Sequence, residues 1–150
     1  MENKSITDTL NLLIRTDKMH KKLFETKFSN IGVNSSQHKI LMYLAQNNKC
    51  SSQKEIAEKF CISPAAVAVL LKKLEANGWI EKTVFDQDNR VNNVKITDKG
   101  INLIENTKIQ AQEIENNIFN EFSQEEINAF CRCLEKMSIS IQRYLSDENI

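Results

Sequence analysis

The sequence predicts a mainly helical protein that carries one small β-hairpin. The chain has 150 residues but only three glycines and one proline, and so few turn-forming residues favour long helices with short connections. Several stretches repeat apolar residues at the spacing of one helix face. Between residues 79 and 97 the pattern changes to two short strand-like runs, WIEKTVF and VNNVKIT, around the polar tip DQDNR.

The first half of the chain is expected to contain three helices with recognisable starts. Residues 5–29 form a long amphipathic helix. Asn34 with Gln37 is a capping pair that opens a second helix, and Ser52 with Glu55 is a capping box that opens a short third helix, QKEIAEKF. The segment QNNKC between the second and third helices is expected to be a loop.

The helix expected over residues 63–77 has well-marked ends. Ser63 suits the N-cap, Pro64 suits the first helical position, and Gly78 is placed to end the helix. One side of this helix is an apolar inner stripe. The opposite face is unusual because it is small and mostly uncharged, whereas a solvated helix face is normally charged. The inner stripe consists of Val67, Leu70, Leu71 and Leu74, and the opposite face carries Ala65, Ala68, Val69 and Lys72.

Two long helices complete the chain after the hairpin. Thr97 caps a helix over about 98–120, in which Gly100 is expected to be mildly unfavourable. Ser123 with Glu126 is a further capping box. It opens a last helix over about 124–146, whose apolar stripe is Ile127, Phe130, Leu134, Met137, Ile141 and Leu145.

Two short helices joined by a tight turn and followed by a hairpin make a winged helix–turn–helix. The smooth outer face of the helix at 63–77 then has two interpretations. It is buried within the protein, or it enters the major groove of DNA, which admits a helix. The hairpin and the caps favour the major groove.

The bulk composition excludes several other classes. The net charge is zero, but residues 101–150 carry four Lys/Arg against nine Asp/Glu, so an anionic partner is expected to meet the more basic first two thirds. No apolar run approaches a membrane span and the N-terminus lacks a signal-peptide core, so a cytoplasmic location is expected. We find no Ser/His/Asp set, glycine loop or metal-ligand cluster, and expect neither an enzyme nor a cofactor or metal site.

Residues 35–100 resemble the MarR family of bacterial transcription regulators. The segments IAEKFCIS and LLKKLEANGWIEK are similar to that family's helix–turn–helix and first wing strand, and DQDNR followed by VKITDKG is similar to its wing. The resemblance implies a homodimer that binds palindromic operators and usually represses transcription. It also implies a helical dimerisation region, residues 1–34 and 98–150, around a DNA-binding domain at 35–97.

The resemblance and the helix faces together name the DNA contacts we expect. Groove contacts are expected from Ser63, Ala65, Ala66, Val69 and Lys72. Relatives usually carry Ser, Thr or Arg on this face, whereas Ala and Val can only pack against thymine methyl groups, so an A·T-rich operator is predicted. Phosphate contacts are expected from Ser36, Ser51, Ser52, Gln53, Lys72, Lys73 and Lys95, although solvated charge is an equally good interpretation of each lysine.

The wing is expected to contribute a minor-groove contact. Arg90 resembles the family's wing arginine, and narrow A·T minor grooves attract arginine. Asp88 is expected to orient Arg90, although the alternative of a surface ion pair stays open. Asn89 stands where many relatives have a second arginine.

Regulation is less well specified by the sequence. The family often binds a small-molecule effector between its lobes, and Arg15, His20, Met42 and Tyr43 are the candidate lining residues. Cys61, in the helix–turn–helix turn, is the candidate redox thiol. A winged-helix module that docks a protein and has no affinity for DNA is the alternative function, since its recognition face would also stay smooth and apolar.

Overall fold

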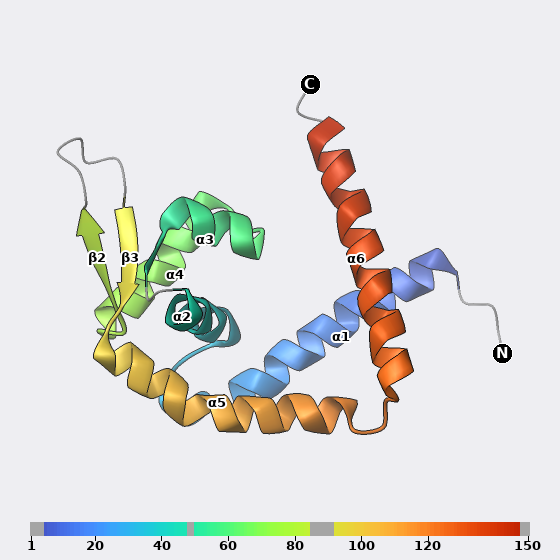
Figure 1. Cartoon of the computed structure of the whole chain (residues 1–150), viewed down its shortest axis with the longest axis horizontal. Coiled ribbons are helices and arrows are strands. Elements are labelled where there is room, and N and C mark those ends of the chain that lie inside the picture. Colours follow the sequence, from blue (N-terminus) through green and yellow to red (C-terminus); the bar gives the residue numbers. More distant parts are fainter. Residues whose placement is uncertain (1–4, 48–49, 85–91, 148–150) are drawn as a thin grey trace. The chain divides into compact units, whose positions relative to one another are not determined.

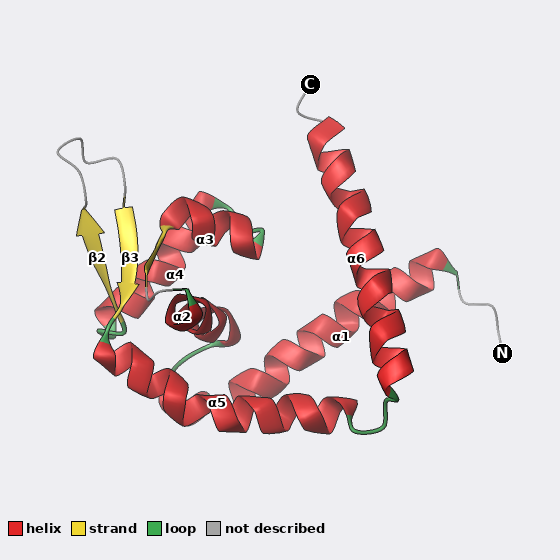
Figure 2. Cartoon of the chain, viewed as in Figure 1, coloured by secondary structure: helices red, strands yellow, loops and turns green. Residues whose placement is uncertain are grey.

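A computed structural model describes residues 5–47, 50–84 and 92–147. Its elements are the helices α1 (Ile6–Lys27), α2 (Ser35–Gln46), α3 (Gln53–Phe60), α4 (Pro64–Ala76), α5 (Asp98–Phe119) and α6 (Gln124–Asp147), a short 3-10 turn at Ser29–Ile31, and the strands β1 (Cys50–Ser52), β2 (Ile80–Val84) and β3 (Asn92–Ile96) (Figure 1). The predicted class, mainly helical with a small hairpin, is confirmed (Figure 2).

The strands form a three-stranded antiparallel sheet in the order β1-β3-β2. The predicted hairpin is β2 and β3, which pair from Ile80 opposite Ile96 to Val84 opposite Asn92. The third strand was not predicted, because Cys50–Ser52 was assigned in part to a loop. It pairs with β3, with Cys50 opposite Lys95, and such a short strand is specified by a partner more than forty residues away in the chain.

The predicted helix starts are confirmed in detail. Asn34 and Gln37 exchange side-chain to backbone hydrogen bonds of 2.9 and 3.0 Å at the start of α2. The same reciprocal arrangement opens α3 through Ser52 and Glu55. It opens α6 as well, where Ser123 and Glu126 are linked by bonds of 2.9 and 3.2 Å. These boxes satisfy amide donors that a helix start otherwise leaves unpaired.

By its contacts the chain divides into two compact units, residues 1–111 and 112–150. The hydrophobic core belongs to the first unit, where it joins α2, α3 and α4 to the sheet. Its fully buried members include Ile40, Leu41, Leu44, Ile56, Val67, Leu71, Leu74 and Val94. In the second unit no side chain from residue 112 to 146 is buried. Within the described residues no helix has the length and apolar character needed to cross a bilayer.

Candidate nucleic-acid interface

The turn between α3 and α4 is built from backbone hydrogen bonds. The N–H of Ile62 donates to the carbonyl of Ala57 (3.1 Å) and the N–H of Cys61 donates to that of Glu58 (3.3 Å). In this type of helix end the first residue after the helix is usually a glycine in the left-handed conformation. Here that residue is Cys61, with φ of 51°. Ser63 then caps α4 through a 3.2 Å bond from the N–H of Ala66, and Pro64 follows at the first helical position as predicted.

The two faces of α4 differ in exposure as the sequence indicated. Val67, Leu71 and Leu74 are fully buried, and Leu70 is half-buried. On the other face Val69 has 57% of its surface exposed. Ala65, Ala68 and Lys72 are exposed too. An exposed helix face of methyl groups is uncommon on a soluble domain, so this face is available to a partner.

The C-terminal end of α4 is tied to the first turn of α5. Gly78, with φ of 72°, completes a hydrogen-bonded stop in which the N–H of Trp79 donates to the carbonyl of Leu74 (3.0 Å). The Thr97 hydroxyl donates to the Gly78 carbonyl (2.7 Å) and the Lys99 ammonium donates to the Asn77 carbonyl (2.8 Å). The C-terminal end of α4 and the start of α5 are therefore joined by direct contacts.

The expectation that Gly100 mildly destabilises this helix is corrected by its packing. A Cβ at position 100 would lie 2.3 Å from the carbonyl oxygen of Trp79 and 2.7 Å from Cγ1 of Ile96. That oxygen also accepts the N–H of Thr97 (3.1 Å). The close approach of α5 to the end of α4 therefore requires a residue without a side chain.

The residues predicted to contact phosphate lie in different environments. Ser36 and Lys72 are exposed, and the Lys95 ammonium lies 3.5 Å from the Glu81 carboxylate. Ser51, in contrast, is only 3% exposed and donates to the Glu55 carboxylate (2.9 Å).

The start of α3 carries a local negative charge. Glu55 receives the backbone N–H of Ser52 (2.8 Å) and the hydroxyl of Ser51. These two hydrogen bonds lower the pKa of the Glu55 carboxyl, which therefore stays ionised. Ser52 and Gln53, both part-exposed, stand beside this carboxylate, so a DNA phosphate at this helix start would meet a like charge.

The two strands β2 and β3 form the base of the wing. Val94 and Ile96 of β3 and Ile80 of β2 are buried against the lobe. Asp88, Asn89 and Arg90 lie outside the described residues, so their predicted contacts stay predictions.

The four candidate effector residues line neither the hollow between α1, the start of α2 and the end of α4 nor the hollow between α1, α2, α3 and α4. Arg15 is exposed and His20 and Met42 are part-exposed. Tyr43 belongs to a chain of polar groups between α2 and β1, where its hydroxyl lies 3.5 Å from the Ser51 hydroxyl. Cys61 is exposed, and within the described residues no three His, Cys, Asp or Glu side chains gather as metal ligands.

The sequence reasoning missed a buried histidine. His38 is 4% exposed and its ring lies 4.9 and 5.7 Å from the rings of Phe24 and Phe28. Its Nε2 is 2.8 Å from the Thr107 hydroxyl, which itself donates to the carbonyl of Leu103 and so accepts from the histidine. Burial lowers the pKa of His38 to about 4. His38 thus joins α1, α2 and α5 as a neutral side chain. Its immediate neighbours Gln37 and Lys39 are polar, so the available signal was its position one helical turn before Leu41.

Comparison with known proteins agrees with this geometry. A family model described as the MarR family matches residues 33–91. The transcriptional regulator ZitR of Lactococcus lactis is 41% identical over 73 residues, which cover 49% of this chain and 49% of ZitR. The uncharacterized HTH-type transcriptional regulator YdgJ of Bacillus subtilis is 29% identical over 110 residues, covering 73% of this chain and 66% of YdgJ. The chain therefore spans about half to two thirds of the length of these curated relatives.

The fold also matches a protein solved on DNA. The crystal structure of the S. aureus MepR–DNA complex superposes with a TM-score of 0.82 at 26% identity. The match covers 92% of this chain and 99% of that chain. The match therefore includes the helices that precede and follow the helix–turn–helix and its wing in the sequence.

Proposed function

We propose that this chain is a transcriptional repressor of the MarR type that binds a palindromic, A·T-rich operator as a homodimer; the MarR family model that matches residues 33–91 and the likeness to the MepR–DNA complex support it. The observation that carries the proposal is the outer face of α4, on which Ala65, Ala68 and Val69 are exposed beside Lys72. A helix of this kind fits the major groove without side chains that obstruct its approach.

The chemistry of that face favours A·T base pairs. Alanine and valine have no hydrogen-bonding groups for base edges, but their methyl groups pack against the thymine methyl. Ser63 is engaged as the N-cap, so its hydroxyl is partly committed to the helix. Direct readout by α4 is therefore weak, and we propose that Arg90 adds preference for a narrow A·T minor groove.

Dimerisation is supported by the apolar surface that the single chain leaves exposed. In α6 the exposed fractions are 45% for Phe130, 49% for Ile139 and 51% for Ile141, and no side chain of residues 112–146 is buried. A helical segment without a core of its own is not expected to be stable in water. A second copy of the chain would cover this surface and place two recognition helices about 34 Å apart, one turn of DNA.

Two experiments test the proposal. A gel-shift titration with the promoter region upstream of the protein's own coding sequence is expected to give a specific, salt-sensitive complex. A selection from random duplexes is expected to return palindromes with A·T-rich half-sites. G·C-rich half-sites would contradict the account of α4, and the lack of any enriched sequence would favour the protein-docking module.

Release by a small ligand completes the proposal. Arg15, His20, Met42 and Tyr43 remain the residues that the family resemblance suggests for an effector. Competition of added small molecules with operator DNA in the same gel shift tests their role, and an alanine variant of each residue should then change the competing concentration.

A further inference from the structure

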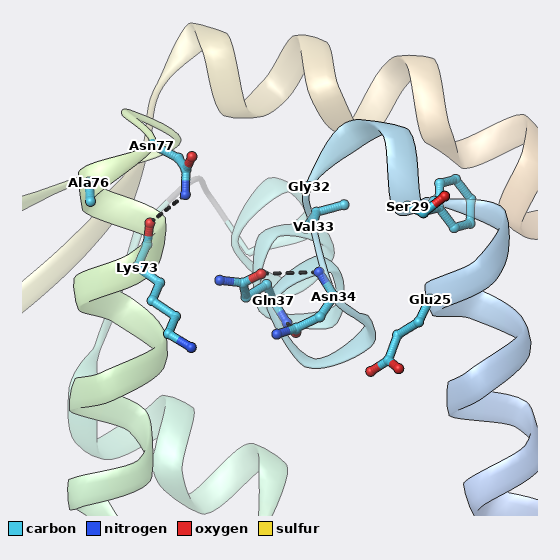
Figure 3. A pocket seen from close by; sticks show the side chains of 10 residues that line it. Glu25, Ser29, Gly32, Val33, Asn34, Gln37, Lys73, Ala76 and Asn77 are labelled. Carbon is cyan, nitrogen blue, oxygen red and sulfur yellow. Dashed lines mark hydrogen bonds between the residues drawn. The ribbon is translucent and has the colours of Figure 1, made fainter.

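A polar hollow of about 410 Å³ lies in the first unit between α1, the start of α2 and the last turn of α4 (Figure 3). Of its apolar lining residues, Phe28 and Val33 are buried in its floor (0% and 3% exposed), and Ala76 is exposed. Its volume is within the range of small-molecule sites, and its polar lining residues converge near the start of α2. It contains none of the four effector candidates named above.

The capping pair of α2 turns two amide groups outward at this hollow. The Oδ1 atom of Asn34 accepts the N–H of Gln37, and the Oε1 atom of Gln37 accepts the N–H of Asn34. Since both amide oxygens are used, both NH2 groups remain as donors. Gln37 is 3% exposed, and its Nε2 has no hydrogen-bond partner among the described residues. In Figure 3 this nitrogen points into the hollow, on the side of Lys73.

The other capping boxes of the described chain have a different chemistry. In α1, α3 and α6 the third helical residue is Asp8, Glu55 or Glu126, whose carboxylate neutralises the positive end of the helix. At α2 a neutral amide stands there instead. The partial positive charge of this helix start is therefore not compensated locally, and it lies beside two unused N–H donors and favours an anion.

Two charged side chains line opposite sides of the hollow. Figure 3 shows Lys73 on α4 on one side and Glu25 on α1 on the other. Neither side chain makes an ion pair within the described part of the chain. The hollow thus offers a cationic side and an anionic side, with the amide groups of Gln37 and Asn34 between them.

We propose that this hollow binds a small zwitterion of the α-amino acid class. Its carboxylate accepts from Gln37, Asn34 and Lys73, and its ammonium group faces Glu25. Binding itself does not depend on the proposed function. Its consequence does, because a carboxylate bound to Lys73 withdraws a cation from the flank of the recognition helix and so lowers affinity for DNA.

Amide spectroscopy of the full-length protein without DNA tests the binding directly. In an isotope-labelled sample, the side-chain NH2 resonances of Gln37 and Asn34 are expected to shift saturably with L-leucine or L-phenylalanine. The matched acids without the amino group, 4-methylpentanoate and 3-phenylpropionate, are expected to bind about tenfold more weakly, since they lose one charged contact. Equal binding of both series would overturn the assignment of Glu25.

Two variants separate binding from folding. Gln37→Glu keeps the capping box, in the form that α1, α3 and α6 use, but places a carboxylate where the ligand's carboxylate would lie, so affinity is expected to fall at least about tenfold. Lys73→Met is expected to weaken binding, whereas Lys72→Met, which alters the neighbouring lysine outside the hollow, leaves it unchanged.

The proposal is overturned if no probe gives a saturable shift up to about 20 mM, well above a millimolar dissociation constant. It is also overturned if Gln37→Glu or Lys73→Met binds as tightly as the wild type. Operator binding is measured separately by gel shift. Failure of the ligand titration therefore leaves the regulator proposal standing, and loss of DNA binding leaves the ligand site standing.

Discussion

Substitution of Gly100 by alanine separates local helix propensity from tertiary packing, because the two predict opposite signs. Gly100 lies in the first turn of α5. Propensity predicts that alanine there stabilises the helix by up to about 1 kcal/mol. Packing predicts the reverse, since the new Cβ would lie 2.3 Å from the Trp79 carbonyl oxygen and 2.7 Å from Ile96.

These contacts set bounds on the expected loss in the free energy of unfolding. Overpacking of a close-packed site typically costs about 1–3 kcal/mol, and the upper end applies here because the nearest atom is backbone that also accepts the N–H of Thr97. After the gain in propensity, Gly100→Ala should lower the free energy of unfolding by about 2 kcal/mol. For a chain of 150 residues this is a fall in Tm of about 4–8 °C.

Thermal unfolding followed by circular dichroism measures this shift. Wild type and variant are compared at equal protein concentration, because the Tm of an associating protein depends on concentration. Asn102→Ala, at an exposed position two residues along the same helix, is the control and should leave Tm unchanged or slightly raised. If Gly100→Ala unfolds at the wild-type temperature or above it, the close approach of α5 to Trp79 is wrong.

Four further predictions concern other parts of the molecule. The pKa of His38 is about 4 in the folded chain against 6.5 for a free histidine. At a pH between these two values, the unfolded chain therefore binds a proton at His38 that the folded chain does not bind. The free energy of unfolding in urea should therefore fall by about 2 kcal/mol from pH 7 to pH 5, and His38→Gln should remove most of this slope. Cys61→Gly relieves a left-handed residue and should raise the free energy of unfolding by about 1 kcal/mol; if oxidant still weakens DNA binding in this variant, Cys61 is not the redox thiol. Phe130→Glu should shift the molecular mass in solution from dimer to monomer by light scattering, and an unchanged mass would argue against α6 in the interface. Arg90→Ala should weaken operator binding about tenfold or more in a gel shift while the dimer stays folded, and unchanged affinity would remove the wing from the mechanism.

Helix boundaries were predictable because their determinants are close in the sequence. The capping residues Asn34, Ser52, Ser63 and Ser123 each bond to a backbone amide three residues later, a spacing that is visible in the chain itself. The two faces of α4 follow from helical periodicity for the same reason. The MarR-like motifs also predicted a winged helix, which the three-stranded sheet and the match to the fold of the MepR–DNA complex confirm.

Other features depend on residues far apart in the chain. β1 exists because Cys50–Ser52 meets β3, and nothing in three polar residues indicates a strand. Ser51 was expected at the surface, yet it is buried because that pairing turns it toward Glu55. In the same way, the sequence does not indicate that Lys73 and Glu25 line one hollow.

The sequence by itself determined the helices, their caps, the outward face of α4 and the resemblance to the MarR family, since each depends on neighbours within about one helical turn or on a contiguous motif. Tertiary structure decided the roles of individual side chains. It made Gly100 a requirement for packing, kept His38 neutral, and left the amide nitrogen of Gln37 without a partner beside Lys73. The physical reason is that a steric contact, a buried charge and an unused hydrogen-bond donor are each defined by atoms that only folding brings together.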